Sequence, residues 1–206
     1  MIRNLIFDLG GVLLNLDFEA TARSFRVLGL YNFDELYTQA RQTGFFDAFD
    51  KGHISPDQFR NELRKYLPPH TSDEAIDHAW NAMLLNLPTE RLELLQNLRR
   101  KYKLYLLSNT NEIHVTAFSN YLQQTFGFPD FSNYFDQWYY SCRMGMRKPD
   151  EEIFHKVMND HGLIAEETIF IDDSKQHVTG AARTGIKAVW LEPGQTVFTL
   201  LEQGVY

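Results

Sequence analysis

Residues 2–14 are Ile2-Arg3-Asn4-Leu5-Ile6-Phe7-Asp8-Leu9-Gly10-Gly11-Val12-Leu13-Leu14. A short apolar run ends in this stretch on a carboxylate, and two glycines follow almost at once. An apolar run of β-branched and aromatic residues closed by glycine is typical of a buried strand, so we expect a strand over residues 2–7. A strand that ends on Asp8 and opens into a glycine-rich turn holds a charged group at the rim of a sheet. Asp8 is therefore the first candidate site residue.

Composition and charge describe an ordinary globular chain. It has 206 residues, of which 44% are hydrophobic and 23% are charged. This length permits one domain, or one core domain that carries a large insertion. The net charge is −7, and Lys and Arg are spread along the chain. Such a chain lacks the basic footprint of a nucleic-acid-binding protein, so we expect no nucleic-acid partner.

The sequence favours a cytoplasmic protein without a membrane segment. Cys142 is the single cysteine, so neither an intramolecular disulfide nor a cysteine metal cluster is expected. The first residues lack a basic segment followed by an apolar stretch, which argues against a signal peptide. No apolar run approaches the roughly 20 residues that a bilayer-spanning helix needs.

The pattern of apolar residues divides the chain into two parts. Residues 17–87 show helical spacing with no convincing strand, and Ser55-Pro56-Asp57-Gln58 forms a helix start with a cap residue. After residue 88, helical stretches alternate with short apolar strands at 103–107, 135–141, 168–171 and 187–191. This alternation predicts an α/β fold with a Rossmann-like parallel sheet. We expect a core domain formed by 1–16 and 88–206, interrupted by an all-helical cap domain at 17–87.

Polar residues stand at the ends of three expected strands, namely Asp8, Ser108 with Asn109, and Asp172 with Asp173. Open α/β sheets bind ligands at the carboxyl ends of their strands, so these groups should meet at one edge. Crowded carboxylates repel one another, and Mg²⁺ resolves this repulsion while bridging to a phosphate. Ser108 and the amides that follow each strand could hold phosphate oxygens.

A lysine completes the expected site. Lys148 lies in the stretch Arg147-Lys148-Pro149-Asp150 and would supply the positive charge that a phosphate and Asp8 both need. An aspartate that attacks phosphorus and becomes an aspartyl-phosphate is an established catalytic strategy. Each of these groups also has a plainer interpretation, because Asp, Ser and Asn cap helices and a lysine is commonly solvated.

Four motifs carry a resemblance to a known family: Phe-Asp8-Leu-Gly-Gly-Val-Leu, Leu-Leu-Ser108-Asn-Thr, Arg-Lys148-Pro-Asp and Phe-Ile-Asp172-Asp173-Ser. In this order they resemble the haloacid dehalogenase-like hydrolase superfamily, and the insertion at 17–87 resembles the helical cap of one subgroup. The resemblance implies a nucleophile at Asp8, a charge-stabilising Lys148, and phosphate binding by Ser108, Asn109 and Gly11. It also implies Mg²⁺ bound by Asp8, the Gly10 carbonyl and the Asp172–Asp173 pair, without deciding which of those two acids binds directly.

Gly10 departs from the pattern of this family. Typical phosphatases of the family carry a second Asp at this position, which protonates the leaving group and later activates water. The loss of a general acid costs about 10²–10⁴ in rate. Three explanations stay open: another residue or a water replaces the acid, the leaving group departs with little help, or the protein is no longer an efficient enzyme. Sugar-phosphatase-like relatives that also carry Asp-Leu-Gly here are similar to this chain, so Gly10 is no proof of inactivity.

We therefore expect a Mg²⁺-dependent phosphatase that acts on small phosphorylated metabolites, with sugar phosphates favoured. One alternative is a haloacid dehalogenase, which tolerates a non-acidic residue at position 10 but needs no metal. The other is a binding or regulatory protein on a weakened catalytic scaffold. The aromatic cluster Phe45, Phe46 and Phe49 either lines the substrate pocket or, more commonly for such clusters, forms the core of the cap.

Three side chains could stand in for the missing acid, although a surface or structural role is the commoner expectation for each. His114 and Glu112 follow the second motif closely, and Asp17 lies at the junction with the expected cap. Cys142 has no visible base beside it, which favours a structural role for the thiol.

Overall fold

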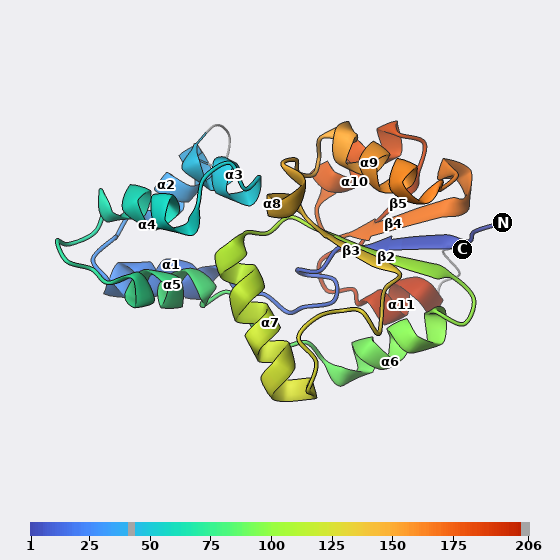
Figure 1. Cartoon of the computed structure of the whole chain (residues 1–206), viewed down its shortest axis with the longest axis horizontal. Coiled ribbons are helices and arrows are strands. Elements are labelled where there is room, and N and C mark those ends of the chain that lie inside the picture. Colours follow the sequence, from blue (N-terminus) through green and yellow to red (C-terminus); the bar gives the residue numbers. More distant parts are fainter. Residues whose placement is uncertain (41–43, 203–206) are drawn as a thin grey trace.

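The computed structural model describes residues 1–40 and 44–202. Within these residues, a five-stranded sheet has the strand order β3-β2-β1-β4-β5, and all neighbouring strands run parallel. The strands are β1 (Asn4–Phe7), β2 (Lys103–Ser108), β3 (Gln137–Tyr140), β4 (Thr168–Asp172) and β5 (Lys187–Trp190). The expected α/β fold with a parallel sheet is confirmed (Figure 1).

The register of the central strands brings their carboxyl ends level. Phe7 of β1 pairs with Leu106 of β2 on one side and with Ile171 of β4 on the other. Asp8, which follows Phe7, therefore lies at the same edge of the sheet as the ends of β2 and β4. Side chains that alternate along each strand point to opposite faces, and both faces are buried.

Helices cover both faces of the sheet. The helices of this part are α6 (Thr89–Leu98), α7 (Glu112–Phe126), α8 (Ser141–Met144), α9 (Glu151–His161), α10 (Lys175–Arg183) and α11 (Val197–Glu202). Leu5 and Phe7 pack in one apolar cluster with residues of α6, α7 and α11, whereas Ile6 packs in another with residues of α9 and α10. Figure 1 shows the two groups of helices on opposite sides of the sheet.

The segment that follows β1 is helical and has its own apolar cluster. Its helices are α1 (Phe18–Val27), α2 (Phe33–Ala40), α3 (Phe45–Asp50), α4 (Pro56–Arg64) and α5 (Asp73–Asn81). Ser55 caps α4 in a full capping box with Gln58, as its sequence predicts. The buried apolar residues of α1 to α5 form one cluster, to which α7 contributes Ile113. This separate cluster supports the division into a core of 1–16 and 88–206 and a cap of 17–87, which stays a prediction.

One expected strand is shorter in the structure than in the sequence pattern. Residues 135–141 were expected to form a strand, but β3 begins at Gln137 and Ser141 begins α8. The Phe135 ring packs edge-on against Phe7 in the core and so reaches the apolar cluster from the loop before the strand. The hydroxyl of Ser141 accepts a hydrogen bond from the backbone N–H of Thr110, which ties the chain down where the strand ends.

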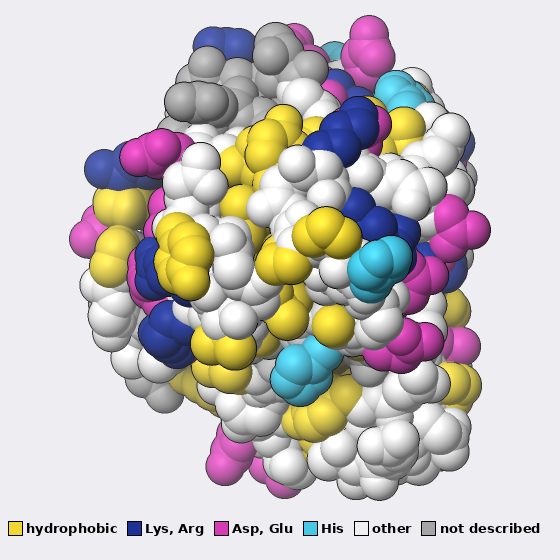
Figure 2. Space-filling view, turned by 90° about the vertical axis from the view of Figure 1, so that its left-hand side faces the viewer, with side chains coloured by type: hydrophobic (Ala, Val, Ile, Leu, Met, Phe, Trp, Pro, Cys, Tyr) yellow, Lys and Arg dark blue, Asp and Glu magenta, His cyan; other side chains and the backbone are white. Residues whose placement is uncertain are grey.

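The surface at the end formed by α1 to α5 mixes side chains of every kind. Figure 2 shows acidic and basic side chains interspersed on this face, with hydrophobic side chains between them. Among the described residues, no helix is both long enough and apolar enough to cross a lipid bilayer.

Candidate active site

A buried lysine joins two carboxylates at the carboxyl edge of the sheet. The Lys148 ammonium lies 2.8 Å from Oδ1 of Asp8 and 2.6 Å from Oδ2 of Asp172. It also donates a hydrogen bond of 2.8 Å to the carbonyl of Leu107. An ammonium has three donors, so these three acceptors satisfy it completely, which a charge with no exposed surface requires. The structure thus brings together three of the predicted site residues.

Burial and the shared lysine act against each other on the two carboxyl groups. Burial raises the pKa of Asp8 to about 7, although the neighbouring Lys148 ammonium favours the ionised form. For Asp172, burial also raises the pKa, but the charges and hydrogen bonds of Lys148 and His177 outweigh it and bring the pKa to about 2. The contacts with Lys148 and His177 thus favour the ionised form of Asp172 more strongly than burial lets Lys148 favour that of Asp8.

The Asn109 side chain holds the loop that carries Lys148. Oδ1 of Asn109 accepts a 2.9 Å hydrogen bond from the backbone N–H of Lys148, and Nδ2 donates one of 2.9 Å to its carbonyl. Two bonds to one peptide segment fix the start of the lysine side chain relative to β2. Asn109 is thus a positioning residue for Lys148, and its predicted contact with a phosphoryl group stays a prediction.

Asp173 lies against the glycine turn after β1. Gly11 has φ +76°, and a Cβ built on it would lie 2.1 Å from Oδ2 of Asp173. Only glycine fits there, both because of this close approach and because side chains rarely adopt that φ. Ser108, Gly10 and Asp173 line the same cavity as Asp8, whereas Asp172 is not among its lining residues. The two neighbouring acids of the fourth motif therefore face different partners.

His177 belongs to the site, although its sequence position did not single it out. Its Nδ1 lies 3.0 Å from both carboxylate oxygens of Asp172, so Nδ1 carries the proton and donates it. Its Nε2 lies 3.4 Å from Nδ2 of Asn109 and accepts from it. Burial lowers the pKa of His177, which favours the neutral ring.

Among the described residues, three potential metal ligands lie close together, and the Lys148 ammonium already contacts two of them. Asp8, Asp172 and His177 each offer an atom within 4.8 Å of the others. The Lys148 ammonium contacts both carboxylates of this group, and the imidazole presents N–H rather than a lone pair to it. Lys148 therefore already balances the charge of both carboxylates in this group.

The cavity above these residues measures about 380 Å³. Its lining combines the strand ends and following loops of the core with residues of the helical segment: Asp8, Leu9, Gly10, Leu14, Leu16, Phe18, Tyr37, Asp50, Trp80, Met83, Leu84, Ser108, Asn109, Thr110, Asn111, His114, Arg147, Asp173, Ser174 and His177. A Cβ on Gly10 would lie 2.6 Å from Cδ1 of Leu16, and both residues line this cavity.

The three candidates for the missing acid lie in different places. His114 lines the cavity, but burial lowers its pKa to about 4, so it is neutral near pH 7. Glu112 pairs with Arg143, and Asp17 caps α1 and pairs with Arg23; neither carboxylate lines the cavity. None of the three thus offers an acidic proton to a leaving group near neutral pH.

The aromatic cluster of the cap is part of its core. Phe46 and Phe49 are buried in the apolar cluster of α1 to α5, and Phe45 packs against that cluster. None of the three lines the cavity, so the interpretation as cap core holds for all of them. The residues that do line the cavity from this segment were not singled out by the sequence pattern.

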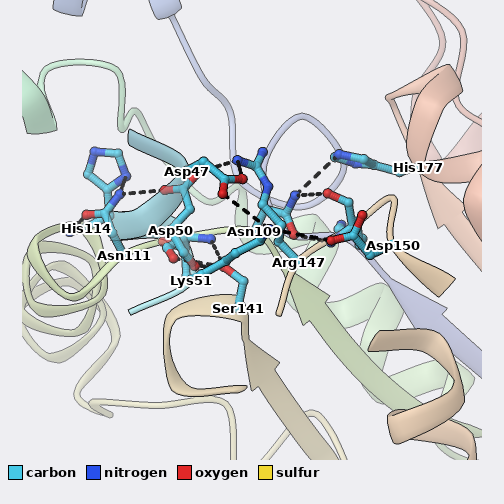
Figure 3. Close-up of polar contacts among 12 residues, drawn as sticks. Asp47, Asp50, Lys51, Asn109, Asn111, His114, Ser141, Arg147, Asp150 and His177 are labelled. Carbon is cyan, nitrogen blue, oxygen red and sulfur yellow. Dashed lines mark hydrogen bonds and ion pairs between the residues drawn. The ribbon is translucent and has the colours of Figure 1, made fainter. Parts of the chain in front are cut away.

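Polar contacts connect the helical segment to the loops of the core (Figure 3). Nη1 of Arg147 lies 3.2 Å from Oδ1 of Asp47 and 3.4 Å from Oδ2 of Asp50, both on α3. A second ion pair runs in the opposite direction, since Nζ of Lys51 lies 3.6 Å from Oδ2 of Asp150 in the core. Arg147 directly precedes Lys148, so α3 contacts the same loop that carries Lys148. Apart from charges of opposite sign, no pattern in the sequence indicates these contacts.

Comparisons with known proteins agree with the geometry. The model of the haloacid dehalogenase-like hydrolase family matches residues 2–185. The chain is 31% identical over 194 residues to the D-ribitol-5-phosphate phosphatase of Bacteroides thetaiotaomicron, covering 94% of both chains. It superposes with a TM-score of 0.86 on the wild-type crystal structure of a HAD family enzyme from that organism in complex with magnesium and inorganic phosphate, at 39% identity over 97% of this chain and 99% of that one. L-2-haloacid dehalogenase of Xanthobacter autotrophicus shares the fold alone, with 18% identity, a TM-score of 0.62, and 98% of this chain and 82% of that one covered.

Proposed function

The chain belongs to the haloacid dehalogenase-like hydrolases, and from this premise we propose that it is a Mg²⁺-dependent phosphatase of small phosphorylated metabolites. Sugar and sugar-alcohol phosphates are the favoured substrate class, which the similarity to a ribitol-phosphate phosphatase supports. The observation that carries the proposal is the buried contact of 2.8 Å between Asp8 and the Lys148 ammonium at the floor of the cavity. This arrangement suits a carboxylate nucleophile that attacks a dianionic phosphoryl group.

The residues around Asp8 fit Mg²⁺. Hard oxygen ligands are what this ion prefers, and it commonly takes one or two carboxylates together with substrate phosphate. We propose Asp8, the Gly10 carbonyl and Asp173 as these ligands, because Asp173 lies directly against the glycine turn. Asp172 then acts through Lys148, whose ammonium it contacts at 2.6 Å, rather than as a direct ligand. When bound, the ion supplies positive charge that reduces the repulsion between Asp8 and the phosphate.

The residues of the chain divide the reaction between them. The carboxylate of Asp8 forms a bond to phosphorus, the ester P–O bond breaks, and the alkoxide leaves with the bonding electron pair and takes a proton from water to become the alcohol. Lys148 balances the charge on Asp8 and on the phosphoryl oxygens, while Asn109 holds the loop that carries Lys148 in place. Ser108 and the turn at Gly11 are the proposed contacts for the phosphoryl oxygens. A water molecule then attacks the aspartyl-phosphate, releasing phosphate and restoring Asp8.

Release of inorganic phosphate from a panel of sugar and sugar-alcohol phosphates, with Mg²⁺ or with EDTA, tests this function. We expect Mg²⁺-dependent turnover that Asp8→Asn abolishes, because an amide is a poor nucleophile. Asp57→Asn, which changes an exposed acid of α4, is the matched control and should retain turnover. Activity in Asp8→Asn would show that the nucleophile is another residue.

The same panel separates the two other functions. Halide release from 2-haloacids without phosphate release would support a dehalogenase, for which the similarity is one of fold alone. Tight phosphate-ester binding without turnover would support a binding protein. The Mg²⁺ and phosphate complex of the similar enzyme favours the phosphatase over both. We propose a cytoplasmic location from the single Cys142, which fits a reducing compartment.

A further inference from the structure

The leaving group of the proposed phosphatase reaction extends toward the helical segment. In a displacement at phosphorus, the attacking and leaving oxygens lie roughly in line, so the alcohol lies on the side opposite Asp8. Asp8 forms the floor of the cavity at the sheet edge, and the helical segment contributes Phe18, Tyr37, Asp50, Trp80, Met83 and Leu84 to the lining. Among these described cavity residues of the helical segment, Asp50 alone carries a charge.

The Asp50 carboxylate is held at the cavity wall by residues of the core. Its Oδ1 lies 3.4 Å from Nδ2 of Asn111, and its Oδ2 lies 3.4 Å from Nη1 of Arg147. Its backbone carbonyl accepts a 2.6 Å hydrogen bond from the Ser141 hydroxyl. Figure 3 shows Asp50 between these residues, where α3 meets the core. The side chain is 21% exposed, and the contacts with Asn111, Arg147 and Ser141 hold the residue in place.

The cavity wall formed by Asp50, Asn111 and Arg147 suits a hydroxyl group, whereas the Asp50 carboxylate repels a phosphate. An ionised carboxylate only accepts hydrogen bonds and has about four acceptor sites, whereas amide and guanidinium N–H groups only donate. A hydroxyl does both, so it can donate to Asp50 while it accepts from a neighbouring N–H group. A phosphoryl oxygen presents negative charge to Asp50 and would be repelled. The apolar side chains that line the same cavity suit the C–H surface of a carbon chain.

We propose that Asp50 is a specificity-determining residue that accepts a hydrogen bond from a hydroxyl group of the leaving alcohol. The inference rests on the proposed phosphatase function and narrows its substrate class to polyhydroxylated phosphate esters. A hydroxyl would add a hydrogen bond to this charged acceptor beside its contacts with Asn111 and Arg147. An ester of the same carbon length without hydroxyl groups cannot make that bond, so the site should bind it less tightly.

Asp47 provides a matched control on the same helix. Its carboxylate contacts the same Nη1 atom of Arg147, at 3.2 Å, but Asp47 is not a cavity-lining residue. A substitution at either position weakens the ion pairing of Arg147. Only a substitution at Asp50 also removes a carboxylate from the wall that faces the leaving group. A difference in substrate preference between the two variants therefore distinguishes a contact of Asp50 with substrate from a structural effect on Arg147.

The experiment compares kcat/KM for xylitol 5-phosphate and for n-pentyl phosphate, which has the same carbon chain without hydroxyl groups. We expect wild type to prefer the polyol ester and Asp50→Asn to reduce that preference about 10- to 100-fold, the range for a hydrogen bond to a charged group. Asp47→Asn should keep the wild-type preference. Turnover of n-pentyl phosphate by Asp50→Asn reports whether the variant folds and keeps its catalytic residues.

Three results would overturn the inference. An unchanged preference in Asp50→Asn would show that its carboxylate makes no contact with a hydroxyl. An equal loss in Asp47→Asn would show that Asp50 acts only through Arg147. If Asp50→Asn does not fold, Asp50→Glu keeps the charge but moves the carboxylate by one methylene, and an unchanged preference there has the same meaning. Absence of phosphate release from both esters by wild type would instead contradict the proposed function itself.

Discussion

Replacing Gly10 by Asp should restore a general acid that this chain lacks. The structure shows where the new side chain would go, because a Cβ on Gly10 meets Cδ1 of Leu16 at 2.6 Å and its Cγ at 3.6 Å. Gly10 does not have the positive φ that would strain another residue, and the obstacle is the end of a flexible side chain. Gly10 and Leu16 both line the cavity, so we expect the carboxyl group of Asp at position 10 to reach the space proposed for the leaving group.

The added side chain should raise the rate of the reaction, while the space that it needs should lower the stability of the fold. A positioned general acid contributes about 10²–10⁴ in rate, or roughly 3–5 kcal/mol of barrier. Overpacking of this kind costs about 1–3 kcal/mol of stability, and the clash involves only the end of Leu16. Leu16→Ala removes the obstacle and is therefore the background in which Gly10→Asp should be measured. In that background we expect faster turnover of alkyl phosphates, whose alcohols are poor leaving groups.

The assay measures kcat for n-pentyl phosphate and for 4-nitrophenyl phosphate in both variants. The nitrophenolate leaves without a proton, so its rate should change far less than the alkyl rate. Gly10→Asn in the same background is the matched control, since it has the same size and no acidic proton. Equal acceleration of both esters, or equal acceleration by Asn and Asp, would refute the reasoning. The wild-type protein should also hydrolyse the aryl ester much faster than the alkyl ester, and equal rates would refute the idea of a missing acid.

Two further predictions concern the glycine turn and a buried histidine. Gly11→Ala should raise the Mg²⁺ concentration needed for half-maximal activity, because φ +76° and the 2.1 Å approach to Asp173 leave no room for a methyl group. Titration of activity with Mg²⁺ measures this concentration. An unchanged value would show that Asp173 is not a ligand of the metal. His114 should make the stability of the fold depend on pH. Burial lowers its pKa from 6.5 to about 4, although the Trp80 carbonyl and Asp77 act in the opposite direction. The contribution of the neutral ring to stability is therefore complete above pH 6.5 and is lost as the pH falls toward 4. The loss is up to about 3 kcal/mol, measured by urea unfolding at pH 7 and pH 4.5, and His114→Gln should show a weaker dependence on pH.

The parallel sheet and the meeting of its strand ends could be predicted from sequence because both follow from local patterns. Alternating strands and helices imply a parallel sheet, and parallel strands place their carboxyl ends at one edge. Asp8, Ser108 and Asp172 therefore came together as expected. Lys148 lies on a loop, so no strand pattern predicts its position. It could be predicted because clustered carboxylates need a positive charge, and the family resemblance indicated which lysine supplies it.

Individual partners within the site were not predictable in this way. The contact of Asn109 with phosphate stays a prediction. The sequence did not indicate that both polar atoms of its side chain form hydrogen bonds with the backbone of Lys148, 39 residues further along the chain. The sequence left Asp172 and Asp173 equivalent, since neighbouring residues at a strand end diverge but nothing local tells which one faces the lysine. Contacts between Asp50 and Arg147 depend on how α3 lies on the core, and no periodicity encodes that placement.

The absence of an acid at Gly10 and the presence of Asp50 in the wall fit a single account of specificity. When leaving-group protonation is weak, binding energy from parts of the substrate remote from phosphorus becomes more important for holding the ester in line with Asp8. A hydroxyl contact at Asp50 supplies such energy at the end of the leaving group. Since Arg147 and Asn111 hold Asp50 from the core side, this contact also requires α3 to lie on the loop of Lys148. Recognition of the alcohol and enclosure of the phosphoryl site therefore depend on the same contacts.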